Sequence, residues 1–463
     1  MINARDKQSA LLITTLSSFL TPFAASSVNI ALPSIAREFS MDAISLSWVA
    51  TAYLLAAAMF LVPVGRFADI HGRKKVFLWG VGIYTVAASL IVFSPSSAFL
   101  IGFRVVQGFG ATMMFGTSTA VLTSLFPIGE RGRAIGITVA AVYLGLSTGP
   151  VFGGFLTQAL GWRSLFLINI PIGILIFVVT RWRLTGEWAE AAGERFDVLG
   201  SAMYSLSLVA LLYGFSQLPS AVGIACVIVG VLSVAAFLQL ESRSASPILN
   251  VRAFRHNTPF VFSNLAALVN YSATFAVTFL LSLYLQYIKG LTPAHAGSIL
   301  IAQPLVMAAV SPLAGKLSDR IEPQKVASIG MALTTAGLAI LIFVGSTTPL
   351  TYIVAGLLVL GLGFALFSSP NTNAVMSSVE KKYYGVASAT LGTMRLAGQM
   401  LSMGLATLIF SLLIGPVQIA PEHYGPFVRS VQVAFALFTV LCFAGIFISL
   451  ARGRIHDNRP LGT

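Results

Sequence analysis

The chain has 463 residues, of which 56% are hydrophobic and only 9% are charged, and its mean hydropathy is +0.87. Water-soluble proteins usually have about 25% charged residues, and a soluble protein of this size could not hide so much apolar surface. The composition therefore excludes a soluble protein and predicts an integral membrane protein.

Fourteen apolar stretches are long enough to cross the hydrocarbon core as helices, which takes about 20 residues. In chain order they lie at 11–34, 45–66, 76–94, 98–126, 134–158, 164–180, 198–217, 221–240, 258–287, 293–315, 325–344, 350–377, 386–413 and 430–451. The first stretch lacks the cleavage site of a signal peptide, so we expect it to remain as a helix. The inner connection 181–197 is expected to form at most a short surface helix. The predicted fold class is an all-α integral membrane protein.

The basic residues gather on one side of the predicted membrane. With the N-terminus in the cytoplasm, 22 of the 28 Lys and Arg residues fall in inner loops and tails, and four fall in outer loops. This is the positive-inside asymmetry, which places both termini in the cytoplasm. The net charge of +13 therefore follows from topology and needs no nucleic-acid partner. Cys226 and Cys442 both lie in apolar stretches and predict no disulfide framework.

Two similar loops indicate an internal repeat. GRFADIHGRKKV (Gly65–Val76) follows the second stretch, and GKLSDRIEPQKV (Gly315–Val326) follows the tenth. The two loops occupy equivalent places once the seventh and eighth stretches are set aside. We therefore predict an N-terminal six-helix bundle (1–183), a connector with two extra helices (184–243), and a C-terminal six-helix bundle with a short tail (244–463).

Five local patterns resemble signatures of one transporter family. GRFADIHGRKK resembles its loop 2–3 signature, RVVQGFGA (Arg104–Ala111) its fourth-helix signature, and GLSTGPVFGG (Gly145–Gly154) its fifth-helix antiporter signature. WRSLFLINIPIG (Trp162–Gly173) and VNIALP (Val28–Pro33) are typical of one branch. Over essentially its full length the chain resembles a major facilitator superfamily transporter of the fourteen-helix drug:proton antiporter branch. The resemblance implies the major facilitator fold, with two six-helix bundles and two inserted central helices.

The two repeated loops carry residues suited to a conformational latch. Asp69, near the end of the second stretch, can pair with a nearby Arg or with the positive N-terminal end of a facing helix. The glycines would allow helices to approach closely at the membrane edge. The alternative is that the basic residues only anchor the topology. The predicted latch residues are Gly65, Asp69, Gly72, Arg73, Gly315, Asp319 and Arg320.

Two arginines fall inside apolar helices. A guanidinium there costs several kcal/mol unless it is paired or faces water, so Arg104 and Arg395 must have partners. The resemblance implies proton handling for Arg104. The alternative for each is a structural arginine satisfied by neighbouring helices.

The fifth stretch carries a row of glycines. Gly145, Gly149, Gly153 and Gly154 recur at helical spacing and would let another helix approach closely. Pro150 removes a helix hydrogen bond and bends the stretch. This combination suits a hinge between two moving halves, and the alternative is a tight static crossing.

Polar, aromatic and methionine side chains in several stretches are candidates to line a central substrate cavity. The alternative for each is that it faces lipid or the protein core. The amides are stronger cavity candidates because they need hydrogen-bond partners in hydrocarbon. The candidates are Phe23, Asn29, Tyr53, Gln107, Met113, Met114, Tyr143, Asn270, Tyr271, Asn371, Asn373 and Gln399.

The predicted membrane interior contains no acid. All fifteen Asp and Glu residues fall in loops, tails or helix ends. Many members of the resembling family carry an aspartate that aligns near Ala24, and it is missing here. A cavity for lipophilic cations normally supplies a buried carboxylate, so neutral, amphipathic or anionic cargo suits this chain better. Proton coupling would have to use an end-of-helix acid such as Asp69, a histidine such as His295, or the arginines.

The predicted function is secondary active transport of a small amphipathic, neutral or anionic molecule by alternating access, as a proton-coupled exporter. An uncoupled facilitator and a non-transporting receptor or scaffold are the alternatives. An enzyme is disfavoured because the five histidines show no metal or triad spacing, and no phosphate-binding loop indicates ATP-driven transport. We expect no cofactor and no metal. The expected partners are membrane lipids, the small-molecule substrate and protons, and the expected state is a multi-pass monomer in the cell membrane.

Overall fold

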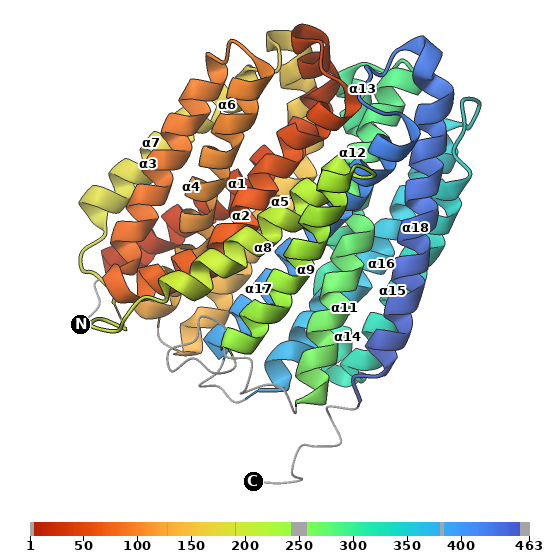
Figure 1. Ribbon diagram of the computed structural model, residues 1–463. Helices are drawn as coiled ribbons and strands as arrows, with labels where there is room; N and C mark the ends of the chain where they lie inside the picture. Colours follow the sequence, from red (N-terminus) through yellow and green to blue (C-terminus); the bar gives the residue numbers. More distant parts are fainter. Residues whose placement is uncertain (1–3, 127, 190, 242–256, 380–383, 454–463) are drawn as a thin grey trace.

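The computed structural model describes residues 4–126, 128–189, 191–241, 257–379 and 384–453 (Figure 1). The side chains of some helical residues, including the predicted latch residue Asp319, lie outside this description. Fourteen helices among the described residues are long and apolar enough to cross a membrane, which confirms the predicted number. The first helix begins and the last helix ends at the same edge of the molecule (Figure 1).

The first six spans are built from seven helices, because the sixth span is broken at Ile168. These helices are α1 (Ala4–Phe39), α2 (Ala43–His71), α3 (Arg73–Val92), α4 (Ser97–Leu125), α5 (Ile128–Leu160), α6 (Ser164–Leu167) and α7 (Asn169–Arg183). The inserted pair follows as α8 (Val198–Gln217) and α9 (Ala221–Glu241).

The last six spans contain two further breaks. Their elements are α11 (Thr258–Thr274), α12 (Ala276–Leu283), the π-helix η1 (Tyr284–Ile288), α13 (Pro293–Leu300), α14 (Ala302–Arg320), α15 (Pro323–Ile342), α16 (Leu350–Ser377), α17 (Tyr384–Leu413), the short 3₁₀-helix η3 (Pro421–His423) and α18 (Tyr424–Leu450). At the break before α12, the backbone N–H of Ala276 donates to Ser402 Oγ at 3.0 Å. A side chain of α17 therefore supplies a hydrogen-bond partner at the interruption, as backbone in hydrocarbon requires.

Several helices begin where a short polar side chain can cap them. Asp42, Asp197 and Asn257 each accept a hydrogen bond from a backbone N–H in the first turn of α2, α8 and α11. Such caps satisfy N–H groups that have no partner within the helix. They fix three membrane-edge positions at which the chain turns.

Each group of six spans packs mainly within itself. In the first half α1 lies along α5 and α3 along α4, and in the second half α15 lies along α16 and α18. The two halves meet where α5 packs on α13 and where α2 packs on α17. The domain boundaries at 183/184 and 243/244 stay a prediction.

The inserted pair lies at the seam between the halves (Figure 1). α8 packs against both α2 and α17, whereas α9 packs mainly on α8 and leaves much of its apolar surface exposed.

Pro63 lies inside α2 and has no N–H for the carbonyl of Met59, four residues earlier. Ser205 Oγ of α8 donates to that carbonyl at 2.8 Å. Beside it, the Tyr204 hydroxyl donates to Ala58 O at 3.0 Å. The inserted helix therefore satisfies a backbone group that a proline frees.

The inner connection 181–197 agrees with the expected limit of at most a short surface helix. Arg181 and Arg183 belong to α7, and the described residues from 184 to 196 contain a turn but no helix. This segment, here called the connector, forms no helix in its described residues because its backbone groups form hydrogen bonds with the neighbouring α2–α3 loop. Arg73 N–H donates to Trp188 O, and Ala191 N–H donates to Asp69 O, each at 2.9 Å.

We predict that Ser205→Ala lowers stability by about 0.5–1 kcal/mol, because the carbonyl freed by Pro63 loses its donor. The measurement is the thermal unfolding of purified protein in detergent. Ser207→Ala is the matched control, since Ser207 Oγ donates only to Tyr204 O of its own helix. Equal unfolding temperatures for Ser205→Ala and Ser207→Ala would contradict this role.

Candidate functional site

The predicted latch in the first half is an ion pair at the end of α2. Asp69 Oδ1 lies 2.8 Å from both Nε and Nη2 of Arg73, the first residue of α3. Arg73 Nη1 also donates to Ser124 Oγ of α4 at 3.1 Å. The guanidinium is buried and links the ends of three helices. The structure therefore brings Asp69 and Arg73 together as the sequence predicted.

Gly72 joins α2 to α3 in a conformation that favours glycine. Its φ is +111°, and a β-carbon there would lie 2.5 Å from Cδ of Glu187. Glu187 occupies this space because its carboxylate accepts from the backbone N–H groups of Lys74 (2.8 Å) and Lys75 (3.2 Å). A carboxylate at this point compensates the positive end of α3. The connector thus supplies a cap to the latch loop.

The connector makes further contacts with the first half. Glu194 forms an ion pair with Arg66, and the rings of Phe196 and Phe67 meet edge to face at 5.9 Å. Nearer its start, the Thr185 hydroxyl donates to Asp6 Oδ2 at 2.6 Å. The connector is therefore fixed along the inner face of the first half rather than loosely linking two bundles.

The two repeated loops share a tether that the sequence analysis did not identify. Lys74 Nζ donates to Leu184 O at 2.5 Å, just after α7 ends. Gln324, at the position equivalent to Lys74 in the second loop, donates to Leu450 O at the end of α18. Each loop is thus attached to the last helix of its own half. The partner of Lys74 could not be predicted from the loop sequence, because Leu184 lies 110 positions away.

The other predicted latch residues are less constrained. No atom lies within 4 Å of a β-carbon added at Gly65, so the expected close helix approach is absent there in this conformation. At Gly315 such a carbon would lie 2.9 Å from Ser369 Oγ. Arg320 is exposed, and the side chain of Asp319 lies outside the described residues.

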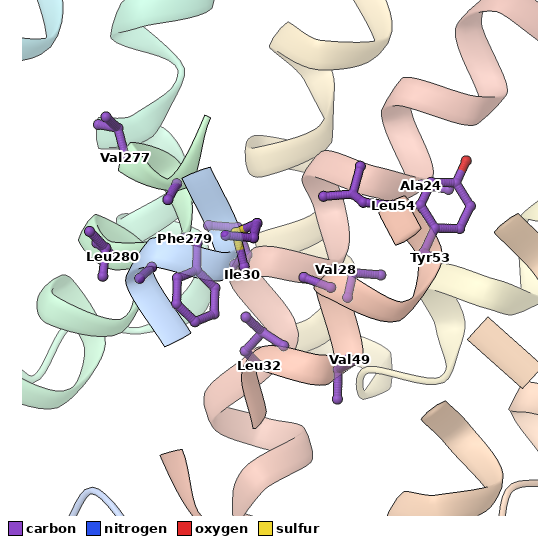
Figure 2. Packing of buried hydrophobic residues seen from close by; sticks show 14 of the residues in the cluster. Ala24, Val28, Ile30, Leu32, Val49, Tyr53, Leu54, Val277, Phe279 and Leu280 are labelled. Atoms are coloured by element: carbon purple, nitrogen blue, oxygen red, sulfur yellow. The ribbon is translucent and has the colours of Figure 1, made fainter. Parts of the chain in front are cut away.

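Hydrogen bonds join the two halves at their outer ends. Ser282 Oγ of α12 donates to Asn29 O of α1 at 2.6 Å. One turn later, in the π-helix η1, Gln286 Nε2 donates to Ile30 O at 3.0 Å. π-helical turns are rare and often mark functional sites. Figure 2 shows the apolar side chains of this region, where Ile30 and Leu32 of α1 lie beside Phe279 of α12.

A second set of outer contacts involves α2 and α17. The hydroxyls of Ser47 and Thr407 lie 3.0 Å apart, and Ala43 N–H donates to Val417 O at 3.0 Å. Farther toward the inner side, α2 and α17 are more widely spaced, since a β-carbon added at Gly392 would meet only Leu61 Cδ2, at 4.0 Å. We name the contacts in this paragraph and the previous one the outer seal.

The glycine row of α5 faces two partners. β-Carbons at Gly145, Gly149 and Gly153 would overlap Phe19, Ser26 and Ser27 of α1, which belongs to the same half.

Gly154 instead faces α13 of the other half, where an added carbon would lie 2.3 Å from Pro293 O. The approach is reciprocal, because a carbon at Gly297 of α13 would lie 2.0 Å from Pro150 O. The predicted close approach is therefore present, and one glycine of the row, Gly154, belongs to the interface between the halves.

Arg104 is enclosed within the first half. Its side chain is 1% exposed. Nε donates to Val49 O at 3.0 Å and Nη1 donates to Gln107 Oε1 at 2.8 Å. The guanidinium carbon also lies 4.3 Å from the centre of the Tyr53 ring, a distance suited to a cation–π interaction. These contacts favour the structural alternative for Arg104 in this conformation.

Arg395 has fewer partners. Its Nη2 donates to Thr372 Oγ1 at 2.6 Å, and its Nε is buried without a hydrogen-bond partner among the described residues. The guanidinium carbon lies 5.8 Å from the centre of the Tyr271 ring. Arg395 is half-buried, so this cation retains accessible surface where Arg104 does not.

The predicted cavity residues divide by burial. The half-buried ones are Tyr143, Tyr271, Asn373 and Gln399. The buried ones are Phe23, Asn29, Tyr53, Gln107, Met113, Met114, Asn270 and Asn371. Two of the amides join helices of the second half, since Asn371 Nδ2 donates to Ser263 O and Asn373 Nδ2 to Ser318 Oγ.

Sequence reasoning missed a cluster at the outer face of the first half. Glu38 accepts hydrogen bonds from Trp162 Nε1 and Arg163 Nη1, each at 2.7 Å, while Arg163 Nε donates to Val92 O. These bonds connect α1, α3 and the start of α6. The signal was present in the Trp-Arg pair of WRSLFLINIPIG, but its acidic partner lies more than 120 positions away.

Comparison with known proteins identifies the family. The model of the Major Facilitator Superfamily matches residues 14–260 and 263–461. The riboflavin transporter RibZ of Clostridioides difficile is 28% identical over 461 residues, covering 98% of this chain and 99% of that protein. The multidrug resistance protein Stp of Mycobacterium tuberculosis is 32% identical and covers 87% and 75%. The cephamycin export protein CmcT of Amycolatopsis lactamdurans is 31% identical and covers 96% and 94%.

Solved structures show the same fold. A bacterial homologue of the human lysosomal transporter Spinster, in an inward-facing and unoccupied conformation, superposes with a TM-score of 0.70 at 16% identity and full coverage of both chains. Together with the fourteen apolar helices, the family match shows that this chain belongs to the Major Facilitator Superfamily and is a multi-pass membrane transporter rather than an enzyme.

Proposed function

We propose that this chain is a proton-coupled exporter of small amphipathic, neutral or anionic molecules at the cell membrane. The observation that carries the proposal is the outer seal, which joins the halves at one end while Gly65 and Gly392 have open surroundings toward the other. We assign this arrangement to the state in which the outer side is closed. Alternating access requires a second state in which the inner side closes instead.

The outer seal consists of contacts that can be made and broken reversibly. Hydrogen bonds of this kind contribute about 0.5–1.5 kcal/mol each, so a small set of them holds one state without making it permanent. Ser282 and Gln286 donate to backbone carbonyls of α1, and water can replace these partners when the outer side opens. The contacts within each half are more extensive, which suits rigid-body motion of the halves.

The charge distribution supports neutral or anionic cargo. Among the acids whose side chains the structure describes, each lies in a loop or at a helix end, as Asp42 and Asp69 do. Arg395 is a half-buried positive charge within α17. Relatives named for multidrug resistance, cephamycin export and riboflavin transport support a small organic substrate without selecting one compound. The name of the cephamycin export protein supports an outward direction.

Reconstituted transport tests the proposal most directly. Proteoliposomes with an imposed pH gradient receive an aromatic carboxylate, a neutral amphipathic compound or an ethidium-type monocation, and substrate and proton fluxes are followed together. We expect proton movement that depends on the carboxylate or the neutral compound. Substrate equilibration without proton movement would support the uncoupled facilitator, and absence of any flux would support a receptor or scaffold. Transport of the monocation alone would contradict the proposed cargo class.

The latch makes a second prediction. Asp69→Asn removes the charge that holds Arg73, and we expect transport to fall roughly tenfold, which corresponds to about 1.4 kcal/mol. Transport is measured in proteoliposomes after size-exclusion chromatography has confirmed a folded protein. Lys75→Gln is the control, because the Lys75 side chain is exposed on the same loop. Equal losses in both variants would assign the effect to loop charge rather than to the ion pair.

Gly154 tests the outer seal. Gly154→Val places carbons where Pro293 O lies, so we expect the outer ends to stay apart and turnover to drop. A cysteine at Ser47, with Cys226 and Cys442 replaced by serine, would then react faster with a membrane-impermeant maleimide added from outside. Gly102→Val is the control, since nothing lies within 4 Å of that position. Unchanged labelling in Gly154→Val would show that this contact does not close the outer side.

A further inference from the structure

We infer that Arg395, Tyr271 and Tyr143 form a substrate site that selects planar aromatic anions, with Arg395 binding the anionic group. This inference rests on the proposed transport function and names the substrate class more narrowly. Its three residues come from α17, α11 and α5, so the site includes side chains of both halves.

The first argument is that Arg104 and Arg395 differ in how many hydrogen-bond acceptors their guanidinium groups have. Arg104 has backbone and side-chain acceptors and a tyrosine face at 4.3 Å. Arg395 has one short bond, to the neutral hydroxyl of Thr372, and it forms no ion pair among the residues that the structure describes. A guanidinium has five N–H donors and no acceptor. Arg395 Nε lacks an acceptor among the described residues, so the guanidinium has hydrogen-bonding capacity that the described protein groups leave unused.

The second argument is the aromatic surroundings of the cation. The Tyr271 ring lies 5.8 Å from the Arg395 guanidinium carbon and meets the ring of Phe364 edge to face at 5.3 Å. Phe364 is buried and fixes one side of Tyr271. A planar ring can stack against such side chains while its charged substituent pairs with arginine. The site therefore offers a flat apolar contact beside a cation.

The third argument is the contribution of the opposite half. Tyr143 of α5 lies within electrostatic range of both Arg395 and Tyr271, and its hydroxyl is close to Ser311 and Ser368. Tyr143 thus places a hydroxyl of the first half beside polar groups of the second. A ligand between Tyr143 and Arg395 would contact both moving bodies and could bias their equilibrium.

Position and exposure agree with a substrate site. Arg395 lies eleven residues from the start of α17, or about 16 Å along the helix. Tyr143, Tyr271 and Arg395 are all half-buried although their helices belong to the packed interior. A charge at this depth is stabilised by water or by an anion. A cationic ligand would be repelled by Arg395, which forms no ion pair with a described carboxylate.

Binding to the purified full-length chain tests the inference with three matched probes: 2-naphthoate, 2-naphthamide and 2-naphthylmethylammonium. They share one ring system and carry an anionic, a neutral and a cationic substituent. Isothermal titration calorimetry in detergent at neutral pH gives each affinity. We expect the naphthoate to bind roughly tenfold more tightly than the cation. Equal or tighter binding of the cation would overturn the inference.

Variants then assign the selectivity to the site. Arg395→Gln is expected to lower naphthoate affinity roughly tenfold and to leave naphthamide affinity nearly unchanged. Arg395→Lys should retain part of the preference, and Tyr271→Ala should weaken both ligands whereas Tyr271→Phe should weaken neither. Arg429→Gln is the control, because Arg429 is an exposed arginine on the outer side. Wild-type naphthoate affinity in Arg395→Gln would overturn the assignment.

The binding test and the transport test distinguish failure of the site assignment from failure of the transport proposal. Arg395→Lys and Tyr271→Phe keep the test valid if Arg395→Gln does not fold, since both preserve side-chain volume. Selective binding of naphthoate without flux in proteoliposomes would contradict the transport proposal and leave the site assignment intact. Flux of neutral cargo without selective binding at Arg395 would contradict the site and leave the transport proposal intact.

Discussion

A polar group inside hydrocarbon must find its partner within the protein, and this constraint shapes both halves of the transporter. It explains why Ser205 of the inserted α8 donates to the Met59 carbonyl that Pro63 frees, and why Arg104 is surrounded by acceptors and an aromatic face. The same constraint makes Arg395 informative, because its partners are incomplete. We therefore assign Arg104 to stability and propose a ligand for Arg395.

The inner and outer ends of the molecule are organised differently. At the inner end, the two repeated loops are each tethered to the last helix of their own half, through Lys74 and Gln324. At the outer end, Gln286 and other side chains connect one half to the other. Strong attachment within a half and weaker attachment between halves are the conditions for rigid-body rocking. The connector adds a cap from Glu187 to one loop, so the two halves are related but not identical.

The sequence predicted the fold well because membrane helices follow simple rules of length and hydropathy. The limits of α8 and α16 matched the predicted 198–217 and 350–377. Short-range pairing was also predictable, as Asp69 and Arg73 show. The course of the connector was not predictable, because it depends on contacts with a loop more than 100 positions away. The cavity candidates could be selected by residue type, but their burial depends on helix rotation and packing, which separated Tyr143 and Tyr271 from buried Asn270 and Asn371.

The central claim is that closure alternates between the two ends. Pulsed electron–electron double resonance measures the distance between two spin labels and so tests this claim directly. One pair of labels is placed at the exposed outer positions Ala98 and Thr347, and another at the exposed inner positions Lys75 and Lys316. The account predicts two populations in lipid, with short outer and long inner distances in one and the reverse in the other, and a shift between them when pH or substrate changes. The account would be contradicted if each pair showed one unchanging distance under all conditions, or if the outer and inner distances lengthened together.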